Sequence, residues 1–447
     1  MDDSTRAASF TLHAPEDPVA WLGREPVTFA ALLAHALDAA KHLPEGEFAI
    51  NLCEDRYRFT VGLLAALLCK QTNLLPPARV PRVVEDIARR YHGSYCLTDK
   101  PCGDLTLAQH VLTPAPAPVE IAPSAIPIIS GEHTAIIAFT SGSTGIPRAN
   151  AKSWGSLVTH AHLAQRQFDI GPLHTVVATV PPQHMYGLET SVMLPLVCRV
   201  AVHTGRPFFP DDIRATLEHV PAPRILVTSP VHLRVCLESG LEWPTVDFII
   251  SATAPLSGEM AAKAERIFDA RVLEIYGCTE AGSLASRRTV DGNVWRLYDG
   301  FKLAQRGEHC YANASHLSQA ARLNDAIEIL CPKTFRLHGR TGDQVNVAGK
   351  RASLADLNHQ LCAIDGVDDG VFFALEAGSD VQRLAALIVS GTLDTPQVMT
   401  ELAKRLDPAF LPRPLRKVDA LPRNETGKLT RERLFSLLCD TDTSALS

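Results

Sequence analysis

The stretch from residue 139 to residue 148 reads FTSGSTGIPR, and its residue types suit the binding of a polyphosphate. Glycines let main-chain N–H groups turn inward, and neighbouring hydroxyl groups add hydrogen-bond donors for phosphate oxygens. Arg148, which closes the stretch, can neutralise phosphate charge through two parallel hydrogen bonds. The candidate phosphate-binding residues are Thr140, Ser141, Gly142, Ser143, Thr144, Gly145 and Arg148.

Taken alone, the same stretch fits a glycine- and serine-rich surface turn equally well, because such turns are common. It is not a P-loop, since the spacing GxxxxGK[ST] is absent from the whole chain. A P-loop kinase is therefore disfavoured. Release of ADP, rather than of AMP and pyrophosphate, would restore that reading.

A second candidate lies at residues 273–283, LEIYGCTEAGS, where a strand pattern runs into a tight turn that carries Thr279 and Glu280. A carboxylate at the carboxyl end of a strand is well placed to hold Mg²⁺ against phosphate oxygens. A solvated loop glutamate is the commoner role of a single Glu. A third candidate, Lys428 in LPRNETGKLTRERL, follows a Thr-Gly turn, although a single lysine is usually exposed without a function.

These residues lie among alternating strand and helix patterns. The strands are expected at 47–53, 134–140, 174–180, 199–204, 224–229, 247–252 and 271–277, and two of the helices at 211–220 and 258–270. Such alternation predicts an α/β fold with layered, mainly parallel sheets. Ligands of such sheets bind at the carboxyl ends of the strands, where the first two candidates lie.

Two domains are expected from the length of 447 residues, because one hydrophobic core seldom supports so long a chain. We expect a large N-terminal domain over residues 1–340 and a small α+β C-terminal domain over residues 341–447. The second domain has the pattern strand, helix, strand, strand, helix. The proline-rich stretch 113–132 is expected to be an extended connector inside the large domain.

Composition excludes several classes of protein. Apolar residues make up 46% and the formal net charge is -6, so the basic surplus of a nucleic-acid binder is missing. The longest apolar run, at 61–69, is too short to span a membrane and fits a buried helix. The acidic start lacks the features of a signal peptide, which gives a cytoplasmic location as the expectation. The eleven cysteines have no metal or disulfide spacing, and the histidines at 160–162 are expected to be structural.

Six motifs occur in the order and approximate spacing found in the adenylate-forming superfamily, which the chain resembles from about residue 45 to its end. They are FTSGSTGIPR at 139–148, PPQHMYGLE at 181–189, SATAPLS at 251–257, IYGCTEAG at 275–282, GRTGDQVNVAGKR at 339–351 and LPRNETGKLTR at 421–431. The superfamily comprises acyl- and aryl-CoA synthetases, adenylation domains of peptide synthetases, and luciferases. The resemblance implies an ATP-dependent activation of a carboxylic acid.

On the nucleotide side, the resemblance implies that residues 140–145 bind the outer phosphates of ATP, with Arg148 in place of the usual lysine. Thr279 and the Mg²⁺-linked Glu280 match the family pattern, and Thr144 is expected beside the Mg²⁺. Lys428 matches the lysine that reaches the carboxylate and the α-phosphate. The further nucleotide-binding residues that the resemblance implies are Tyr276, Gly277, Ala254 and Pro255, the last two beside adenine.

The resemblance also separates two candidate ribose ligands. In the family the ribose-binding aspartate lies about fourteen residues before a Gly-Arg pair, which is Gly339-Arg340 here; this spacing selects Asp325 over Asp343. Arg340 is expected to support the ribose contact. The same comparison places a hinge near 340–343, with Gly342 where the family usually has aspartate or lysine, so the small domain is expected to rotate.

For the acid substrate, the resemblance implies a pocket beside His184, Met185, Tyr186, Gly187, Leu188 and Ser229. His184 is also expected among the catalytic residues, with Lys428, Glu280 and Thr279. These residues suit a modest apolar or aromatic acid, although an apolar stripe of this kind also fits plain core. The expected substrate is an aryl acid such as a hydroxybenzoate, or a small acyl acid. By analogy with stand-alone ligases, secondary metabolism is the expected setting.

The expected second step transfers the acyl group to a phosphopantetheine thiol, either of an acyl carrier protein or of coenzyme A, supplied in trans. An acyl-CoA synthetase with coenzyme A as its sole acceptor is an alternative. A non-catalytic member that only binds nucleotide is another, kept open by Arg148 and Gly342 and opposed by Lys428, Glu280 and Asp325.

Overall fold

Two compact units make up the chain. The computed structural model describes residues 13–103, 105–112, 128–140, 148–307, 309–340, 344–347, 350–375, 383–423 and 429–439. The first unit comprises Met1–Gly292, Arg296–Lys302 and Ala312–Ala321, and the second comprises Asn293–Trp295, Leu303–Tyr311 and Arg322–Ser447. The domain boundary at residues 340 and 341 stays a prediction. Most of the proline-rich connector, 113–127, lies outside the described residues.

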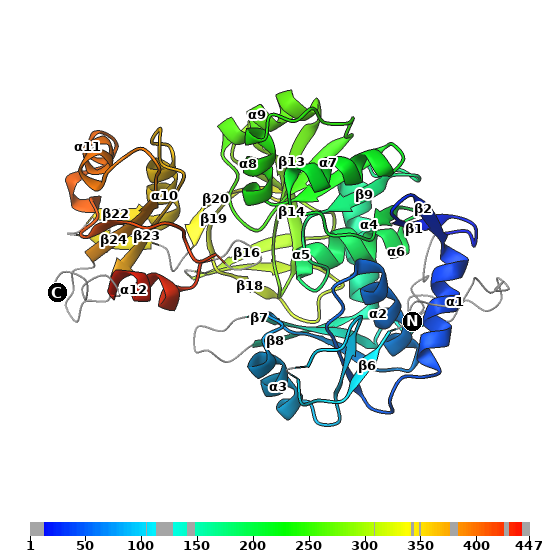
Figure 1. Ribbon diagram of the computed structural model, residues 1–447. Coiled ribbons are helices and arrows are strands. Elements are labelled where there is room, and N and C mark those ends of the chain that lie inside the picture. The colour runs from blue at the N-terminus through cyan, green and yellow to red at the C-terminus, as the bar shows by residue number, and fades with distance from the viewer. Residues whose placement is uncertain are drawn as a thin grey trace. The chain divides into compact units, whose positions relative to one another are not determined.

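The larger sheet of the first unit runs in the order β14-β13-β12-β11-β9-β10-β1-β2 (Figure 1). Every neighbouring pair from β13 to β1 is parallel, whereas β14 pairs antiparallel with β13, and β2 pairs antiparallel with β1. The mainly parallel sheet predicted from the sequence is thus confirmed. Its strands are β1 (Pro18–Leu22), β2 (Glu25–Thr28), β9 (Thr175–Ala178), β10 (Ala201–His203), β11 (Arg224–Thr228), β12 (Phe248–Ser251), β13 (Arg271–Cys278) and β14 (Gly282–Arg288).

Amphipathic helices cover one face of this sheet. In α7 (Pro210–His219), α8 (Pro230–Glu238) and α9 (Gly258–Phe268), apolar residues such as Leu217, Leu233 and Phe268 pack on strand residues such as Leu226 and Ile249. The strands are nearly all apolar because both faces of such a sheet are covered. The remaining helical segments of this region are α4 (Trp154–Gln167), α5 (Met185–Leu188), the π-helix η3 (Glu189–Met193), α6 (Leu194–Val197) and η4 (Thr289–Asp291).

A second sheet of the first unit runs in the order β6-β5-β3-β4-β7-β8, and only β8 is antiparallel to its neighbour. The apolar run at 61–69 falls almost entirely within the buried helix α2, as predicted. The elements are α1 (Phe29–Ala40), β3 (Phe48–Asn51), α2 (Arg56–Leu68), β4 (Thr72–Leu75), α3 (Pro81–Arg90), β5 (Tyr95–Thr98), β6 (Gln109–Val111), β7 (Thr134–Thr140) and β8 (Arg148–Ser153).

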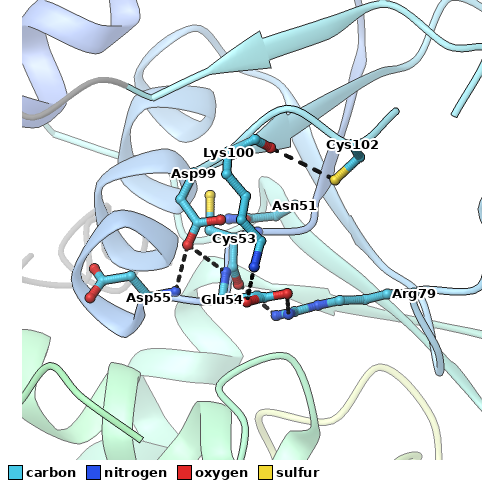
Figure 2. A network of polar contacts seen from close by, with 8 residues as sticks. All are labelled: Asn51, Cys53, Glu54, Asp55, Arg79, Asp99, Lys100 and Cys102. Atoms are coloured by element: carbon cyan, nitrogen blue, oxygen red, sulfur yellow. Dashed lines mark hydrogen bonds and ion pairs between the residues drawn. The ribbon is translucent and has the colours of Figure 1, made fainter. Parts of the chain in front are cut away.

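A polar network ties together the loops at the carboxyl ends of β3, β4 and β5 (Figure 2). The carboxylate of Asp99 accepts hydrogen bonds from the main-chain N–H groups of Glu54 and Asp55 at 2.8 and 2.7 Å. Glu54 in turn pairs with Arg79 at 3.3 Å and with Lys100 at 2.7 Å. The candidate phosphate loop follows β7 at the same edge of the sheet, and hydrogen bonds and ion pairs therefore stabilise that edge.

The second unit contains a small sheet, β23-β24-β25, with helices on both faces. Alternate strand residues pack against α10 and α11 on one face, as Phe372 does, and against α12 on the other, as Phe373 does. Its elements include β19 (Asp325–Cys331), β20 (Thr334–Arg340), β21 (Gln344–Val347), β22 (Lys350–Ser353), α10 (Leu354–Cys362), β23 (Asp369–Leu375), β24 (Arg383–Val389), α11 (Thr395–Arg405), η5 (Pro408–Phe410), β25 (Leu415–Lys417) and α12 (Arg431–Cys439). The expected strand, helix, strand, strand, helix pattern is present.

Four short strands complete the fold: β15 (Val294–Leu297), β16 (Lys302–Arg306), β17 (His309–Asn313) and β18 (Ala321–Leu323). Within the described ranges, no helix combines the length and the apolar character needed to cross a membrane. The cysteines whose side chains are described are free thiols.

Candidate active site

The predicted site residues of the first unit lie in loops that follow parallel strands of the larger sheet. The segment 181–188 follows β9, Ser229 follows β11, Ala254 and Pro255 follow β12, and Thr279 and Glu280 follow β13. Because these strands are parallel, their carboxyl ends share one edge of the sheet. The fold thus gathers residues that are a hundred positions apart in the sequence.

Thr279 and Glu280 occupy the tight turn of the β13–β14 hairpin. Cys278 pairs with Gly282 across the hairpin, so only three residues form the turn. Gly277, two residues before Thr279, lies so close to the main chain of Gly282 that a Cβ atom there would overlap it. Tyr276 is half-buried on the same strand. The short turn and the close approach of Gly277 to Gly282 fix the position of Glu280 at the end of the hairpin.

The candidate phosphate loop closes the β7–β8 hairpin. Thr140 and Arg148 are cross-strand partners at its two ends, while Ser141, Gly142, Ser143, Thr144 and Gly145 lie outside the described residues. The Arg148 side chain is 73% exposed, and its Nη1 lies 4.0 Å from Glu280 Oε1. The base that ends the loop therefore faces the carboxylate of the second motif, as two parts of one site would require.

The surroundings of Glu280 fit a magnesium ion. Its carboxylate is 26% exposed and stands at the outer limit of an ion pair with Arg148. Mg²⁺ is usually held by one or two carboxylates together with substrate phosphates, rather than by a complete cage of protein ligands. In the described part of the chain, no three His, Cys, Asp or Glu side chains form a metal cluster. Glu280 would thus share the ion with phosphate oxygens.

The segment expected beside adenine is anchored to β13. Thr253, which precedes Ala254 and Pro255, has a φ of 82°, a strained conformation for a β-branched residue. Two residues after Ala254, the N–H of Leu256 donates to Oε1 of the buried Glu274 at 3.0 Å.

Glu274 is part of a buried ion pair that the sequence analysis missed. Nη2 of Arg287 lies 2.5 Å from Glu274 Oε2, and the hydroxyl of Thr289 donates to the same oxygen at 2.7 Å. A glutamate in the middle of a buried strand was the signal that could have revealed it. Through Leu256, this pair holds the segment that carries Ala254 and Pro255 against the strand that leads to Glu280.

The predicted substrate residues at 184–188 pack against the ends of β11 and β12. The hydroxyl of Tyr186 lies 3.0 Å from the main-chain oxygen of Thr228 and 2.8 Å from the main-chain oxygen of Ile250. Burial raises the pKa of Tyr186 well above the ordinary value. His184 and Met185 are half-buried, whereas Gly187 and Leu188 are buried. A Cβ atom on Gly187 would overlap the main-chain oxygen of Pro181.

Ser229 lies next to Thr228 and is also buried. Its Oγ lies 2.8 Å from Nδ1 of His232, and burial lowers the pKa of His232. The contact of Tyr186 with Thr228 therefore brings the predicted pocket segment and Ser229 together. A serine–histidine pair at this place can donate to, or accept from, a polar group of a substrate.

Three buried ionisable side chains, Lys152, His160 and Glu189, support the turn. His160 was expected to be structural, whereas the sequence predicted no role for Lys152 or Glu189. Lys152 Nζ donates to the main-chain oxygen of Glu280 at 2.5 Å. Nε2 of His160 lies 2.8 Å from the main-chain oxygen of Ala281. Glu189 accepts hydrogen bonds from both the N–H and the hydroxyl of Ser283. Ionisable residues within the helical patterns were the available signal for His160 and Glu189, whereas the polar, mostly exposed strand β8 gave no such signal for Lys152.

In the second unit, the two predicted ribose residues lie opposite one another. Asp325 begins β19, and Arg340, its antiparallel partner, ends β20. Lys428 and Gly342 lie outside the described residues. Arg423 and Leu429, which flank the segment that contains Lys428, form an antiparallel bridge. Arg423 is held in addition by two hydrogen bonds to the carboxylate of Asp369.

Comparison with known proteins adds a family and several relatives. A family model described as AMP-binding enzyme matches residues 27–302, more than half of the chain. A 4-coumarate–CoA ligase of Halorhodospira halophila is 27% identical over 317 residues, 67% of this chain and 76% of that protein. A D-alanine–D-alanyl carrier protein ligase of Bacillus cereus is 22% identical over 367 residues, 69% of this chain and 71% of that protein.

Among solved structures, the chain is similar to o-succinylbenzoate CoA synthetase from Bacillus subtilis in complex with its acyl-adenylate intermediate. The TM-score is 0.80 at 17% sequence identity, and the match covers 94% of this chain and 95% of that one. The likeness extends over both compact units and shows that the fold of this chain is shared.

Proposed function

We propose, on the premise that this chain belongs to the AMP-binding enzyme family, that it activates a carboxylic acid with ATP and passes the acyl group to a thiol. The chain is an AMP-forming acid–thiol ligase of the adenylate-forming superfamily. The proposal adds the roles of its residues and the class of its substrates. The observation that carries it is the approach of Arg148, which ends the phosphate loop, to Glu280.

In the first step, a carboxylate oxygen of the substrate attacks the α-phosphorus of ATP, and pyrophosphate leaves from the opposite side, giving an acyl-AMP. Bound Mg²⁺ would neutralise the charge of the departing phosphates, and Glu280 with Thr144 would hold it. Arg148 and the hydroxyl groups of the loop would orient the outer phosphates. Lys428 would place its positive charge between the carboxylate and the α-phosphate.

Other residues would orient the rest of the nucleotide and the acid. Asp325 would accept hydrogen bonds from the ribose hydroxyls with support from Arg340. Ala254 and Pro255 would flank adenine, and Tyr276, Gly277 and Thr279 would make further contacts with the nucleotide. His184, Met185, Tyr186 and Ser229 would line the acid. In the second step, a thiolate attacks the acyl carbon and AMP departs, which forms a thioester.

The substrate we favour is an aryl acid such as a hydroxybenzoate, or a small acyl acid. Half-buried Met185 would offer an apolar contact beside the ring of His184, and the Ser229–His232 pair would offer one polar contact. The acceptor is the phosphopantetheine thiol of coenzyme A or of a carrier protein, and the two curated relatives are named for one acceptor each. A cytoplasmic reaction, within secondary metabolism, completes the proposal.

Exchange of labelled pyrophosphate into ATP, measured against a panel of aliphatic and aromatic acids, tests the first step. We expect exchange that depends on one class of acid and that Lys428→Ala lowers by about 100-fold or more, because a charge that stabilises the transition state is lost. Lys404→Ala, which removes an exposed lysine paired with Glu401, is the control and should leave exchange unchanged.

Thioester formation with coenzyme A and with a phosphopantetheinylated carrier protein then identifies the acceptor. Nucleotide binding without exchange for any acid would support the non-catalytic alternative. Release of ADP would support a kinase and overturn the proposal.

A further inference from the structure

The turn that carries Glu280 is held at three successive places by buried ionisable side chains from three other elements. Lys152 on β8 binds the oxygen of Glu280, His160 on α4 binds the oxygen of Ala281, and Glu189 at the start of η3 binds Ser283. Main-chain groups of a hairpin turn are usually satisfied by water or within the turn itself. Here, three ionisable side chains bind these groups instead.

Lys152 is too deeply buried for its amine to bind water in place of the main-chain oxygen of Glu280. The residue is 6% exposed, and burial lowers the pKa of its amine while the carboxylates of Glu189 and Glu280 and the thiol of Cys278 oppose that shift. A buried ammonium is costly unless several partners compensate it. An apolar residue of similar length would fill the same space at lower cost, so packing alone does not explain a lysine at this position.

His160 and Glu189 converge on Gly282, the first residue of β14 directly after the turn. A Cβ atom on Gly282 would lie 2.5 Å from Glu189 Oε1 and 2.6 Å from His160 Nε2. His160 also has Nδ1 at 3.0 Å from the oxygen of Ser156, so that both ring nitrogens face main-chain oxygens.

We propose that Lys152, His160 and Glu189 form a buried support that fixes the direction of the Glu280 carboxylate, with Lys152 as its principal positioning residue. Two basic residues of β8 thus lie at Glu280. Arg148 faces its carboxylate, and Lys152 binds its main-chain oxygen. The bond from Lys152 is buried, whereas Arg148 is exposed and free to turn toward phosphate. The proposal rests on the proposed function, in which Glu280 holds Mg²⁺ with ATP.

The test uses the full chain with four substitutions: Lys152→Met, Lys152→Arg, Glu189→Gln, and the double change Lys152→Met with Glu189→Gln. The double variant removes both buried charges, so it is expected to recover thermal stability that Lys152→Met loses by leaving Glu189 without its cation. Lys100→Met is the control, because Lys100 is an exposed lysine of the same unit that pairs only at the surface with Glu54.

Two measurements separate positioning from folding. Calorimetric titration of ATP at a series of MgCl₂ concentrations gives the Mg²⁺ requirement of binding without any turnover. Acid-dependent pyrophosphate exchange gives kcat and the KM of the acid. For the double variant we expect an Mg²⁺ requirement raised by about 10-fold and a kcat lowered by about 10- to 100-fold, as for groups that orient a metal ligand, with the KM of the acid unchanged.

Recovery of stability together with normal Mg²⁺ requirement and normal kcat in the double variant would overturn the proposal. If both methionine variants fail to fold, Lys152→Arg decides: an unchanged Mg²⁺ requirement refutes positioning, and a raised one supports it. Failure of all the Lys152 variants to fold would assign the cluster to folding alone. Because the titration needs no acid, a wild-type protein that binds Mg²⁺-ATP but shows no exchange would refute the proposed function and still decide this inference.

Discussion

The ammonium of Lys152 donates a hydrogen bond of 2.5 Å to the main-chain oxygen of Glu280, across the two sheets of the first unit. Lys152 lies four residues after Arg148 on β8, and residues at that spacing in a strand point to the same face. Arg148 accordingly also faces Glu280, through its carboxylate. Strand β8 therefore sets the position of the motif at 275–282 relative to the motif at 139–148.

Arg148→Lys tests whether charge or shape matters at the end of the phosphate loop. The Arg148 side chain is exposed and 4.0 Å from Glu280, so among the described residues no tight two-pronged contact needs the guanidinium. We expect Arg148→Lys to keep pyrophosphate exchange within about threefold of wild type, and Arg148→Ala to lower it by about 10- to 100-fold. A large loss in the lysine variant would show that the planar guanidinium itself binds phosphate.

Gly282→Ala tests the packing beneath the turn. Gly282 has a φ of 75°, and a Cβ atom would press on the buried Glu189 and His160. Gly93→Ala is a matched control, because Gly93 has a φ of 74° and no atom within 4 Å of the added Cβ. The control should cost about 1 to 2 kcal/mol of backbone strain.

For Gly282→Ala we expect a loss in the free energy of unfolding at least about 2 kcal/mol larger than for the control, because the neighbours are buried and hydrogen-bonded. Urea unfolding of both variants measures the difference. Equal losses in the two variants would contradict the close approach of Glu189 and His160 to Gly282.

Thr253→Gly is expected to stabilise the protein, because a β-branched residue at a φ of 82° is strained. Relief of about 1 to 3 kcal/mol of strain outweighs the roughly 0.5 to 1 kcal/mol that glycine loses through its more flexible unfolded state. Thr253→Ala keeps the Cβ atom and should give little of this gain. The midpoint of urea unfolding of the three proteins decides, and a lower midpoint for the glycine variant would refute the argument.

Acid sensitivity is expected from two histidines, the buried His203 and the half-buried His316. Burial, with the positive charge of Arg56, lowers the pKa of His203 to about 4, and burial, with His160 and Lys152, lowers that of His316 to about 4. Their unfolded pKa is about 6.5, so the unfolded chain binds more protons between these values. Stability should be complete above pH 6.5 and fall between pH 6.5 and 4, by on the order of 2 kcal/mol for each histidine.

His203→Gln should flatten that dependence, as measured by urea unfolding at a series of pH values. His92→Gln, which replaces an exposed histidine, serves as the control and should keep the wild-type slope. An equal slope in wild type and His203→Gln would show that this histidine is not held neutral by the fold.

The sequence by itself determined the fold class and several of the strands and helices that position the site. Alternating apolar runs at 174–180, 224–229 and 247–252 became β9, β11 and β12, because a strand covered on both faces must be apolar throughout. Six ordered motifs also pointed to the family that the comparison later showed. These signals are local or ordered along the chain, so they can be read without the fold.

Only the tertiary structure revealed what holds the site together. Lys152, His160, Glu189 and Glu274 lie in strand and helix patterns where sequence reasoning expects core or solvated surface, and their partners are up to 128 positions away. A buried charge is tolerated only where the fold supplies its counter-charges and hydrogen bonds. Those partners come from several elements at once, and no pattern within one element can show where they meet.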